Sequence, residues 1–263
     1  MSQPISRSLQ LLGPDEPSPV LIERAEGHSP YFLTCDHGGA RVPACLGDLG
    51  IARSDLERHI GWDIGALEVS RRLSQRLDAT LVAQVYSRLV IDCNRRPATP
   101  PSIPVVSDHT PVPANVDLDE TDIEARRAEI HAPYHDAISW LLDERAARGR
   151  PTVLVAMHSL TPVLDGVQRP WHISFSMDED RRLGDSLIEH MRESPELIVG
   201  DNEPYQINVV DHTIPVHGAS RGLQRVLVEI RQNLIETRAG QREWASRLAD
   251  ALESVLPELA VRI

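Results

Sequence analysis

The chain has 263 residues with 41% hydrophobic content, which suits one large α/β domain or two small ones; we expect a single catalytic domain over 1–263. Its formal net charge of −12 argues against nucleic acid and anionic membranes as partners, and its 4% aromatic content leaves few side chains to stack on bases. The sequence has no apolar run of about 18 residues and no basic start followed by an apolar segment, so we expect a cytoplasmic protein without a membrane span.

The first half of the chain predicts an arm, a helix and three strands. Residues 1–20 are polar and contain four prolines, which predicts a loosely attached N-terminal arm. The first strand is predicted at 31–35, YFLTC, and a helical pattern of apolar residues starts near residue 64. The β-rich segments 80–86 and 88–94 are nearly continuous, and we interpret them as adjacent strands.

The second half alternates strands and helices. A proline-rich segment over 97–117 comes first, and a loop of that length is usually functional, often a lid. The remaining predicted elements are a helix over 119–147, strands at 152–159, 171–176, 205–210 and 225–232, a helix near 179–192 and a final helix from about 241. This alternation predicts an α/β fold with a largely parallel or mixed sheet.

Polar side chains occur near the carboxyl ends of four predicted strands, the edge at which open α/β sheets bind ligands. His37 follows YFLTC, His158 follows TVLVAM, Asn94 and Arg95 follow RLVIDC, and Glu229 lies inside RVLVEIR. A single histidine at a strand end is more often structural than functional. Several polar residues at the same edge indicate a common site.

Two neutral imidazoles and one carboxylate make a catalytic zinc site with an open position for water. The metal lowers the pKa of that water towards about 7 and polarises a carbonyl. A second carboxylate must then carry the proton to the leaving amine. Glu229 suits this role, because a charged residue is not buried in an apolar strand without a reason. The alternative is that Glu229 pairs with Arg225 or Arg231 at the sheet edge.

Other residues offer rival interpretations. His131 and His135 have the i,i+4 spacing that can bind zinc on a helix, but Pro133 between them favours a surface or structural role. Asp63 is either a third metal ligand or a cap for the helix that follows it. Cys35 could be a nucleophile beside a histidine, although a cysteine inside an apolar strand is usually inert.

All 27 basic residues are arginine, and the chain contains no lysine. This excludes Schiff-base catalysis, a P-loop lysine and a Ser–Lys dyad. Anionic substrate groups must therefore be held by arginine, histidine or backbone N–H groups. The three cysteines show no paired spacing, which is typical of a reducing compartment.

The order and spacing of several motifs resemble the N-formylglutamate amidohydrolase family, which is related to zinc carboxypeptidases. The matching motifs between about Tyr31 and Ile235 are DHGGARVP, HIGWDIGA, SRLVIDCNRRP, HAPYH, MHS, HG at 217–218 and VEIRQNLI. The resemblance implies a three-layer α/β/α fold with a central mixed, mostly parallel sheet, of the phosphorylase/hydrolase-like, zinc-carboxypeptidase-like type. It also implies one Zn²⁺ per chain.

The resemblance assigns the metal ligands and the proton carrier. His37, Asp63 and His158 would bind zinc, and Glu229 would be the general base and acid. Carboxypeptidases carry their carboxylate ligand three residues after the first histidine, where this chain has Ala40, so Asp63 takes that role. The glycines of DHGGARVP would let the backbone turn sharply beneath the metal.

The resemblance also assigns the substrate contacts. Asn94 and Arg95 resemble the pair that clamps a substrate carboxylate, since an arginine can bond both of its oxygens. Arg88 would stabilise the oxyanion or bind a second carboxylate, and His217 would lie near the substrate.

We therefore expect a metal-dependent hydrolase of C–N bonds other than peptide bonds. Its substrate would be a small anionic acyl amino acid such as N-formylglutamate, its nucleophile a zinc-bound water, and its place amino-acid degradation. The alternatives are a metallocarboxypeptidase-like hydrolase of peptides or cell-wall fragments, a metal- or ligand-binding homologue without turnover, and a cysteine hydrolase built on Cys35. The sequence does not indicate an oligomeric state.

Overall fold

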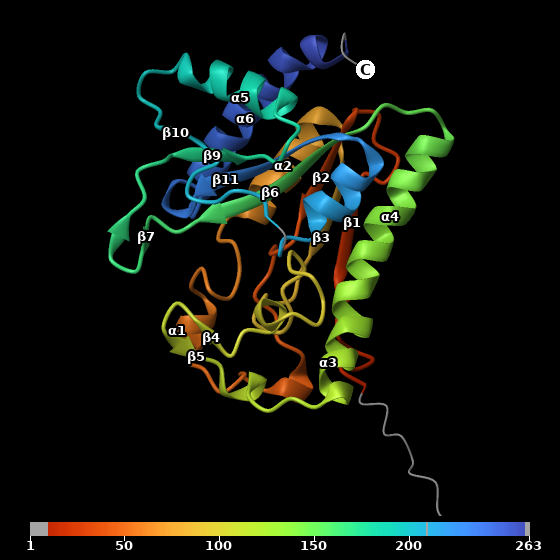
Figure 1. The fold of residues 1–263 in the computed structure, drawn as a ribbon, viewed down its shortest axis with the longest axis vertical. Helices are drawn as coiled ribbons and strands as arrows, with labels where there is room; N and C mark the ends of the chain where they lie inside the picture. The colour runs from red at the N-terminus through yellow and green to blue at the C-terminus, as the bar shows by residue number, and fades with distance from the viewer. Residues whose placement is uncertain (1–9, 209, 261–263) are drawn as a thin grey trace, which may run out of the picture.

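A seven-stranded mixed sheet forms the centre of the molecule, in the strand order β1-β3-β2-β6-β11-β9-β10 (Figure 1). The computed structural model describes residues 10–208 and 210–260. The strands are β1 (Val20–Glu23), β2 (Tyr31–Cys35), β3 (Thr80–Gln84), β6 (Val153–Leu160), β9 (Ile173–Ser176), β10 (Val199–Asp201) and β11 (Gln224–Arg231). Strands β3, β2, β6 and β11 run parallel to one another, β1 is antiparallel to β3, and β9 and β10 run opposite to β11.

Helices cover both faces of this sheet (Figure 1). The helices are α1 (Arg53–Leu56), α2 (Ala66–Leu77), α3 (Glu120–Arg126), α4 (Ala132–Ala147), α5 (Arg182–Arg192) and α6 (Arg238–Ala260). One hydrophobic core joins the sheet to α2, α5 and α6, and a second joins its other face to α4. Side chains of one strand alternate between the two cores: Leu33 of β2 lies in the first and Phe32 in the second. The expected three-layer α/β/α fold is confirmed.

The central strands are apolar on both faces because both faces are covered. All five residues of β2 are buried, and so are seven of the eight residues in each of β6 and β11. The predicted strand at 31–35 is confirmed residue for residue. This continuous burial makes Glu229 in β11 an exception that calls for a chemical explanation.

The predicted helix over 119–147 is confirmed, with an irregular turn inside it. Asp119 caps α3 by accepting a hydrogen bond from the N–H of Asp122 at 2.9 Å. A π-helical turn over Arg127–His131 then joins α3 to α4. The extra residue of such a turn rotates the side chains that follow, and π-turns are frequent at functional sites.

The predicted strand at 88–94 is wrong, because this segment forms turns. Its apolar residues are nevertheless buried in the core under α4, which explains the strand-like pattern. Side chains replace a strand partner: Arg126 donates to the carbonyl of Val90 at 3.0 Å, and Asn115 donates to that of Leu89 at 2.8 Å. The apolar residues of 88–94 therefore reflect burial in the core and not strand pairing.

The predicted strand at 205–210 is also wrong for its described residues. Residues 205–208 form an extended loop without strand pairing, 210 lies in a turn, and residue 209 lies outside the described part of the chain. The loop side chains are partly to fully exposed, so no core enforces a strand here. This segment borders the cleft described below.

The proline-rich segment 97–117 is built from short elements. It contains the two-stranded hairpin β4 (Val106–Ser107) and β5 (Thr110–Pro111), flanked by two 3₁₀ turns. Asn115 ties its end to the core by accepting a hydrogen bond from Arg126 at 2.6 Å. A second small hairpin, β7 (Val163–Leu164) and β8 (Val167–Gln168), follows β6.

The predicted loose arm over 1–20 falls partly outside the described residues. Residues 10–19, in contrast, are attached to the body. Leu11 is buried, and its N–H donates to the Glu129 carboxylate at 2.8 Å, as does the N–H of Leu12. None of the helices in the described part of the chain combines the length and the apolar character needed to cross a bilayer.

Candidate active site

A cleft of about 180 Å³ lies at the carboxyl ends of β2, β6 and β11. These strands are neighbours in the sheet, so residues that follow them meet there, as the strand-end argument predicts. The polar side chains that line the cleft include those of His37, His59, Asp63, Arg88, Asn94, Arg95, His158, Arg169, Tyr205, Asp211 and Glu229. No residue of the segment 97–117 lines it.

His37, Asp63 and His158 converge at the base of the cleft. Nδ1 of His158 lies 2.8 Å from Oδ2 of Asp63, and Nδ1 of His37 lies 3.4 Å from the same oxygen. One ligand atom from each residue lies within 4.8 Å of those of the other two, and all three residues are buried. The Asp63 carboxylate faces the histidines and makes no side-chain cap for α2. This arrangement matches the two-histidine, one-carboxylate ligand set of a catalytic metal site.

The outer nitrogen of each histidine is held by a buried carboxylate. Nε2 of His37 donates to Asp92 at 2.7 Å, and Nε2 of His158 donates to Asp36 at 3.0 Å. Tyr134 is one of the groups that donate to the other oxygen of Asp36, at 2.8 Å. Carboxylates in this position fix the tautomer of a metal-binding histidine and orient its ring. Nδ1 of both rings is then the nitrogen that faces Asp63.

Negative charge surrounds the three candidate ligands. Burial alone would raise the pKa of Asp63, but the charges and hydrogen bonds of His37 and His158 hold it below the usual range. Burial likewise opposes charge on His158, yet hydrogen bonds to Asp36 and Asp63 raise its pKa to about 10. The site therefore attracts a positive charge at Nδ1 of His158, where a proton and a metal ion compete.

Arg88 bonds to two of the aspartates at the site, Asp92 and Asp63. Its guanidinium donates to Asp92 at 2.7 Å and to Asp63 at 3.3 Å. It also lines the cleft, so it can face a bound substrate.

Glu229 is buried beside the ligands without a partner for one of its oxygens. Among the described residues, Oε2 of Glu229 has no hydrogen-bond partner. Burial is the main cause that raises the pKa of this carboxyl to about 7, with the charge of Asp63 adding to it and that of His158 opposing it. The proposed ion pairs are not formed, since Arg225 donates to Asp178 at 2.8 Å and Arg231 to Asn233 at 3.0 Å. A buried, poorly paired carboxyl in a cleft is typical of a catalytic group.

Asn94 and Arg95 line the cleft, as expected for a carboxylate clamp, but both already have partners. The side-chain oxygen of Asn94 accepts hydrogen bonds from the N–H groups of His212 and Thr213, at 3.2 and 3.1 Å. Arg95 donates to Asp211 at 2.6 Å.

His217 is not among the residues that line the cleft. It lies buried with its Nε2 2.8 Å from Nδ1 of His135, and burial lowers its pKa to about 4. Cys35 points into the core on the α2 side of the sheet, and burial raises its thiol pKa well above the usual value. That position contradicts the cysteine-hydrolase alternative.

Arg169 is a cleft residue that the sequence argument missed. It is 8% exposed, donates to the hydroxyl of Tyr205 at 2.6 Å, and lies 4.9 Å from the centre of that ring. It precedes β9, which runs antiparallel to β11, so the amino end of β9 lies at the same edge as the carboxyl ends of the central strands. The expectation that site residues follow the carboxyl ends of strands therefore does not predict Arg169.

Comparisons with known proteins agree with this fold. A model of the N-formylglutamate amidohydrolase family matches residues 29–236. The crystal structure of gene product Atu2144 from Agrobacterium tumefaciens is 37% identical, with a TM-score of 0.91 over 95% of this chain and 99% of that one. An N-formylglutamate amidohydrolase from Ralstonia eutropha JMP134 is 19% identical and shares the fold, with a TM-score of 0.69 over 94% of this chain and 100% of that one. No curated protein matches. The chain belongs to the N-formylglutamate amidohydrolase family.

Proposed function

We propose that this chain is a zinc-dependent amidohydrolase that removes an N-acyl group, formyl in the first instance, from an acidic amino acid such as glutamate. The observation that carries the proposal is the convergence of two Nδ1 atoms and a carboxylate next to the poorly paired Glu229. Membership of the N-formylglutamate amidohydrolase family supports the hydrolysis of an amide bond.

The residues at the base of the cleft fit a zinc ion. His37, Asp63 and His158 would hold it, because their ligand atoms converge and both histidines donate their Nε2–H groups away from it. A bound zinc ion polarises the amide carbonyl and makes water more acidic.

Glu229 would carry the proton. In its ionised form it accepts a proton from the attacking water, and it then donates that proton to the nitrogen of the departing amino acid. Its raised pKa of about 7 suits both steps, because a general acid and base works best when its pKa is near the working pH. Its place opposite His158 in the register of β11 and β6 keeps it next to the ligands.

The cleft favours a small anionic substrate. Arg88, Arg95 and Arg169 all line it, so two carboxylates of an acyl acidic amino acid could each find a guanidinium. Arg169 is the most available of the three, because its side chain bonds to a neutral phenol whereas the other two face aspartates. The cleft volume of about 180 Å³ is large enough for a small substrate.

Hydrolysis of N-formyl-L-glutamate by the wild type and by Glu229→Gln tests the proposal. We expect the variant to keep its zinc, measured by elemental analysis, and to lose about 10²–10⁴-fold in kcat. Chelation should abolish the wild-type activity and added zinc should restore it. Full activity in Glu229→Gln, or activity that survives complete removal of metal, would overturn the proposal. An N-formyl amide without carboxylates is the matched substrate control.

A further inference from the structure

Four histidines gather beside α4, and none of them lines the cleft. His131 ends the π-helical turn before α4, and His135 lies one helical turn further on. His212 and His217 come from the segment before β11, where a second π-helical turn spans Ile214–Gly218. π-Helix is rare, at well under about 1% of residues, and one such turn occurs in each segment that supplies the group.

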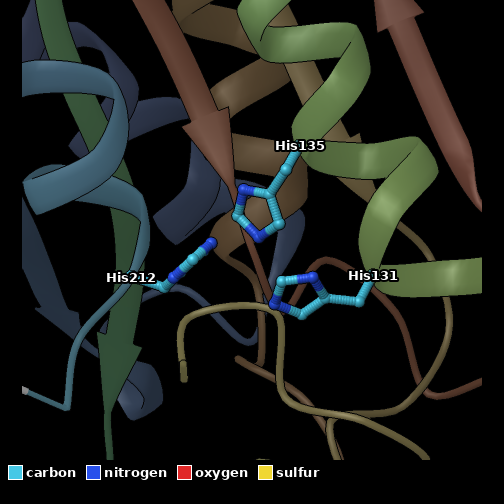
Figure 2. A group of neighbouring side chains, drawn as sticks. All are labelled: His131, His135 and His212. Atoms are coloured by element: carbon cyan, nitrogen blue, oxygen red, sulfur yellow. The ribbon is translucent and has the colours of Figure 1, made fainter. Parts of the chain in front are cut away.

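Three of these rings, those of His131, His135 and His212, form a compact group that we call the histidine cluster. Figure 2 shows the three imidazoles pointing toward one another, His135 from α4, His131 from the turn before it and His212 from the opposite segment. Their ring centres lie 4.4, 4.5 and 5.0 Å apart, and one nitrogen from each lies within 4.8 Å of the other two. Nitrogens that bind the same ion lie at about 2.1 Å from it, and rings this close together can supply them.

Hydrogen bonds fix the protons of the buried rings. A carbonyl can only accept, so Nε2 of His135 donates to the carbonyl of Cys93 at 2.8 Å, and Nε2 of His131 donates to that of Arg95 at 3.2 Å. Nδ1 of neutral His135 then accepts from Nε2 of His217 at 2.8 Å. His131 keeps a lone pair at Nδ1.

Both nitrogens of His135 are hydrogen-bonded, and its proton can move from one nitrogen to the other. If its proton moves from Nε2 to Nδ1, the hydrogen bond to His217 reverses, and the His217 proton moves to Nδ1, which faces the Ser139 hydroxyl at 3.4 Å. An ion bound at either nitrogen of His135 therefore takes the place of the hydrogen bond that this nitrogen makes to His217 or to the carbonyl of Cys93. His217 acts as a positioning residue for it, much as a carboxylate does for other metal-binding histidines.

The chemistry of the cluster differs from that of the cleft. Among the described residues, no carboxylate hydrogen-bonds to any of the four rings, whereas aspartates hold both histidines at the base of the cleft. His212 has no side-chain hydrogen bond within the described chain, and its ring is only partly buried, which leaves a route for an ion from solvent. A set of neutral imidazoles suits borderline ions such as Zn²⁺, Ni²⁺, Co²⁺ and Cu²⁺, and not Mg²⁺ or Ca²⁺, which prefer oxygen.

We propose that His131, His135 and His212 form a second site for a divalent transition-metal ion, separate from the site in the cleft. The carbonyls of Cys93 and Arg95 already contact the cluster, so an ion bound there ties α4 and the segment of His212 to the turn that carries Asn94 and Arg95. The second site would stabilise one wall of the cleft.

Titration of the metal-free full-length chain with Co²⁺, followed by visible absorption and by equilibrium dialysis, tests the second site. We expect two ions per wild-type chain and one in the His37→Ala/His158→Ala variant, which lacks the cleft site. Adding His212→Gln to that variant should remove the last ion. His190→Gln, which changes a partly exposed histidine on α5, is the matched control and should remove none.

The outcomes separate this inference from the proposed function. If the cleft binds no metal, the wild type takes up one ion, which His212→Gln removes and His37→Ala does not. The second site is overturned if the His37→Ala/His158→Ala variant binds nothing, or if His212→Gln leaves every stoichiometry unchanged. If circular dichroism shows that the double variant does not fold, the test compares the wild type with the single variant His212→Gln. The inference requires His212→Gln to bind one ion fewer than the wild type.

Discussion

Asp92 accepts a hydrogen bond from Nε2 of His37 at 2.7 Å, on the side of the ring away from Asp63. Asp92→Asn keeps the shape but removes the charge that makes the imidazole a stronger ligand. We expect zinc to bind about 10–100-fold more weakly, the usual cost of losing such a partner.

Competition with a chromophoric chelator measures this affinity, in a His212→Gln background so that only the cleft site is read. The control is Asp143→Asn, which alters a surface pair with Arg221. Equal affinity in Asp92→Asn and in the control would show that Asp92 does not support the metal.

Glu229 should make the metal-free protein less stable at high pH. Its pKa rises from 4.5 to about 7 on folding, so its favourable contribution is present in full below pH 4.5 and is lost as the pH rises to about 7. This shift corresponds to about 3 kcal/mol. In Glu229→Gln the contribution cannot titrate, so the variant should gain stability relative to the wild type between pH 4.5 and 8.

Urea unfolding of both chelated proteins at several pH values measures the difference in the free energy of unfolding. A difference that stays constant with pH would contradict the buried, titrating carboxyl. The variant at each pH serves as the reference for every other group in the chain.

Zinc uptake at the cleft should release a proton below the pKa of His158, which is about 10. In the metal-free chain this histidine carries a proton between Asp36 and Asp63, and the ion must displace it from Nδ1. Apparent zinc affinity should therefore rise with pH, by up to about tenfold per pH unit for one proton. Calorimetry in buffers of different ionisation enthalpy counts the protons, and a count of zero at pH 7 would contradict the assignment.

Arg169 should select carboxylate-bearing substrates. Removing a charge-assisted contact of about 1.5–3 kcal/mol lowers kcat/KM by roughly 10–150-fold, so we expect a loss of this size for N-formyl-L-glutamate in Arg169→Gln. An N-formyl amide without carboxylates should lose far less. Arg148→Gln, at the exposed end of α4, is the control, and equal losses on both substrates would rule out a role in recognising charge.

Gly39 should tolerate no larger residue. A Cβ atom there would lie 2.1 Å from the carbonyl oxygen of Val85, in the segment that continues β3. Gly39→Ala should therefore lower the free energy of unfolding by roughly 1–3 kcal/mol, the cost of overpacking. In Gly13→Ala, the matched control, the nearest atom is a side-chain oxygen of Glu16 at 3.4 Å, so a similar loss there would refute the steric explanation.

The close approach of Gly39 to Val85 also corrects one expectation from the sequence. We expected the glycines after His37 to permit a sharp turn, yet neither Gly38 nor Gly39 has the positive φ that would require glycine. They are needed for space: the loop passes against the backbone of Gln84 and Val85.

The fold and the meeting of His37, His158 and Glu229 could be predicted because each rests on a local pattern, whereas Asp63 was placed with them only by the family resemblance. Strands buried on both faces, such as 31–35 and 153–160, appear as unbroken apolar runs, and the residues that end them must meet in a parallel sheet. The segment 88–94 has the same pattern but is a buried loop, because the side chains of Arg126 and Asn115 serve its carbonyls. No property of the segment itself reveals partners so distant in the chain.

The residues that could not be predicted depend on long-range geometry. Arg169 reaches the cleft because β9 runs antiparallel to β11. A short apolar segment does not indicate the direction in which its strand runs. Asp92 lies in the segment wrongly predicted as a strand, so its contact with His37 could not be seen. The sequence indicates only part of the histidine cluster. The i,i+4 spacing of His131 and His135 predicts that these two lie close together, but His212 is distant in the sequence and meets them only in the folded chain.

The sheet order places the proposed proton carrier and two of the proposed metal ligands on or next to neighbouring central strands. The loop that includes Tyr205 and Asp211 forms another wall of the cleft. Changes in that loop alter the shape and charge met by a substrate while the spacing of His37, His158 and Glu229 stays fixed by the strands. Loop exchange could thus change which substrate the cleft accepts while the proposed catalytic residues keep their positions.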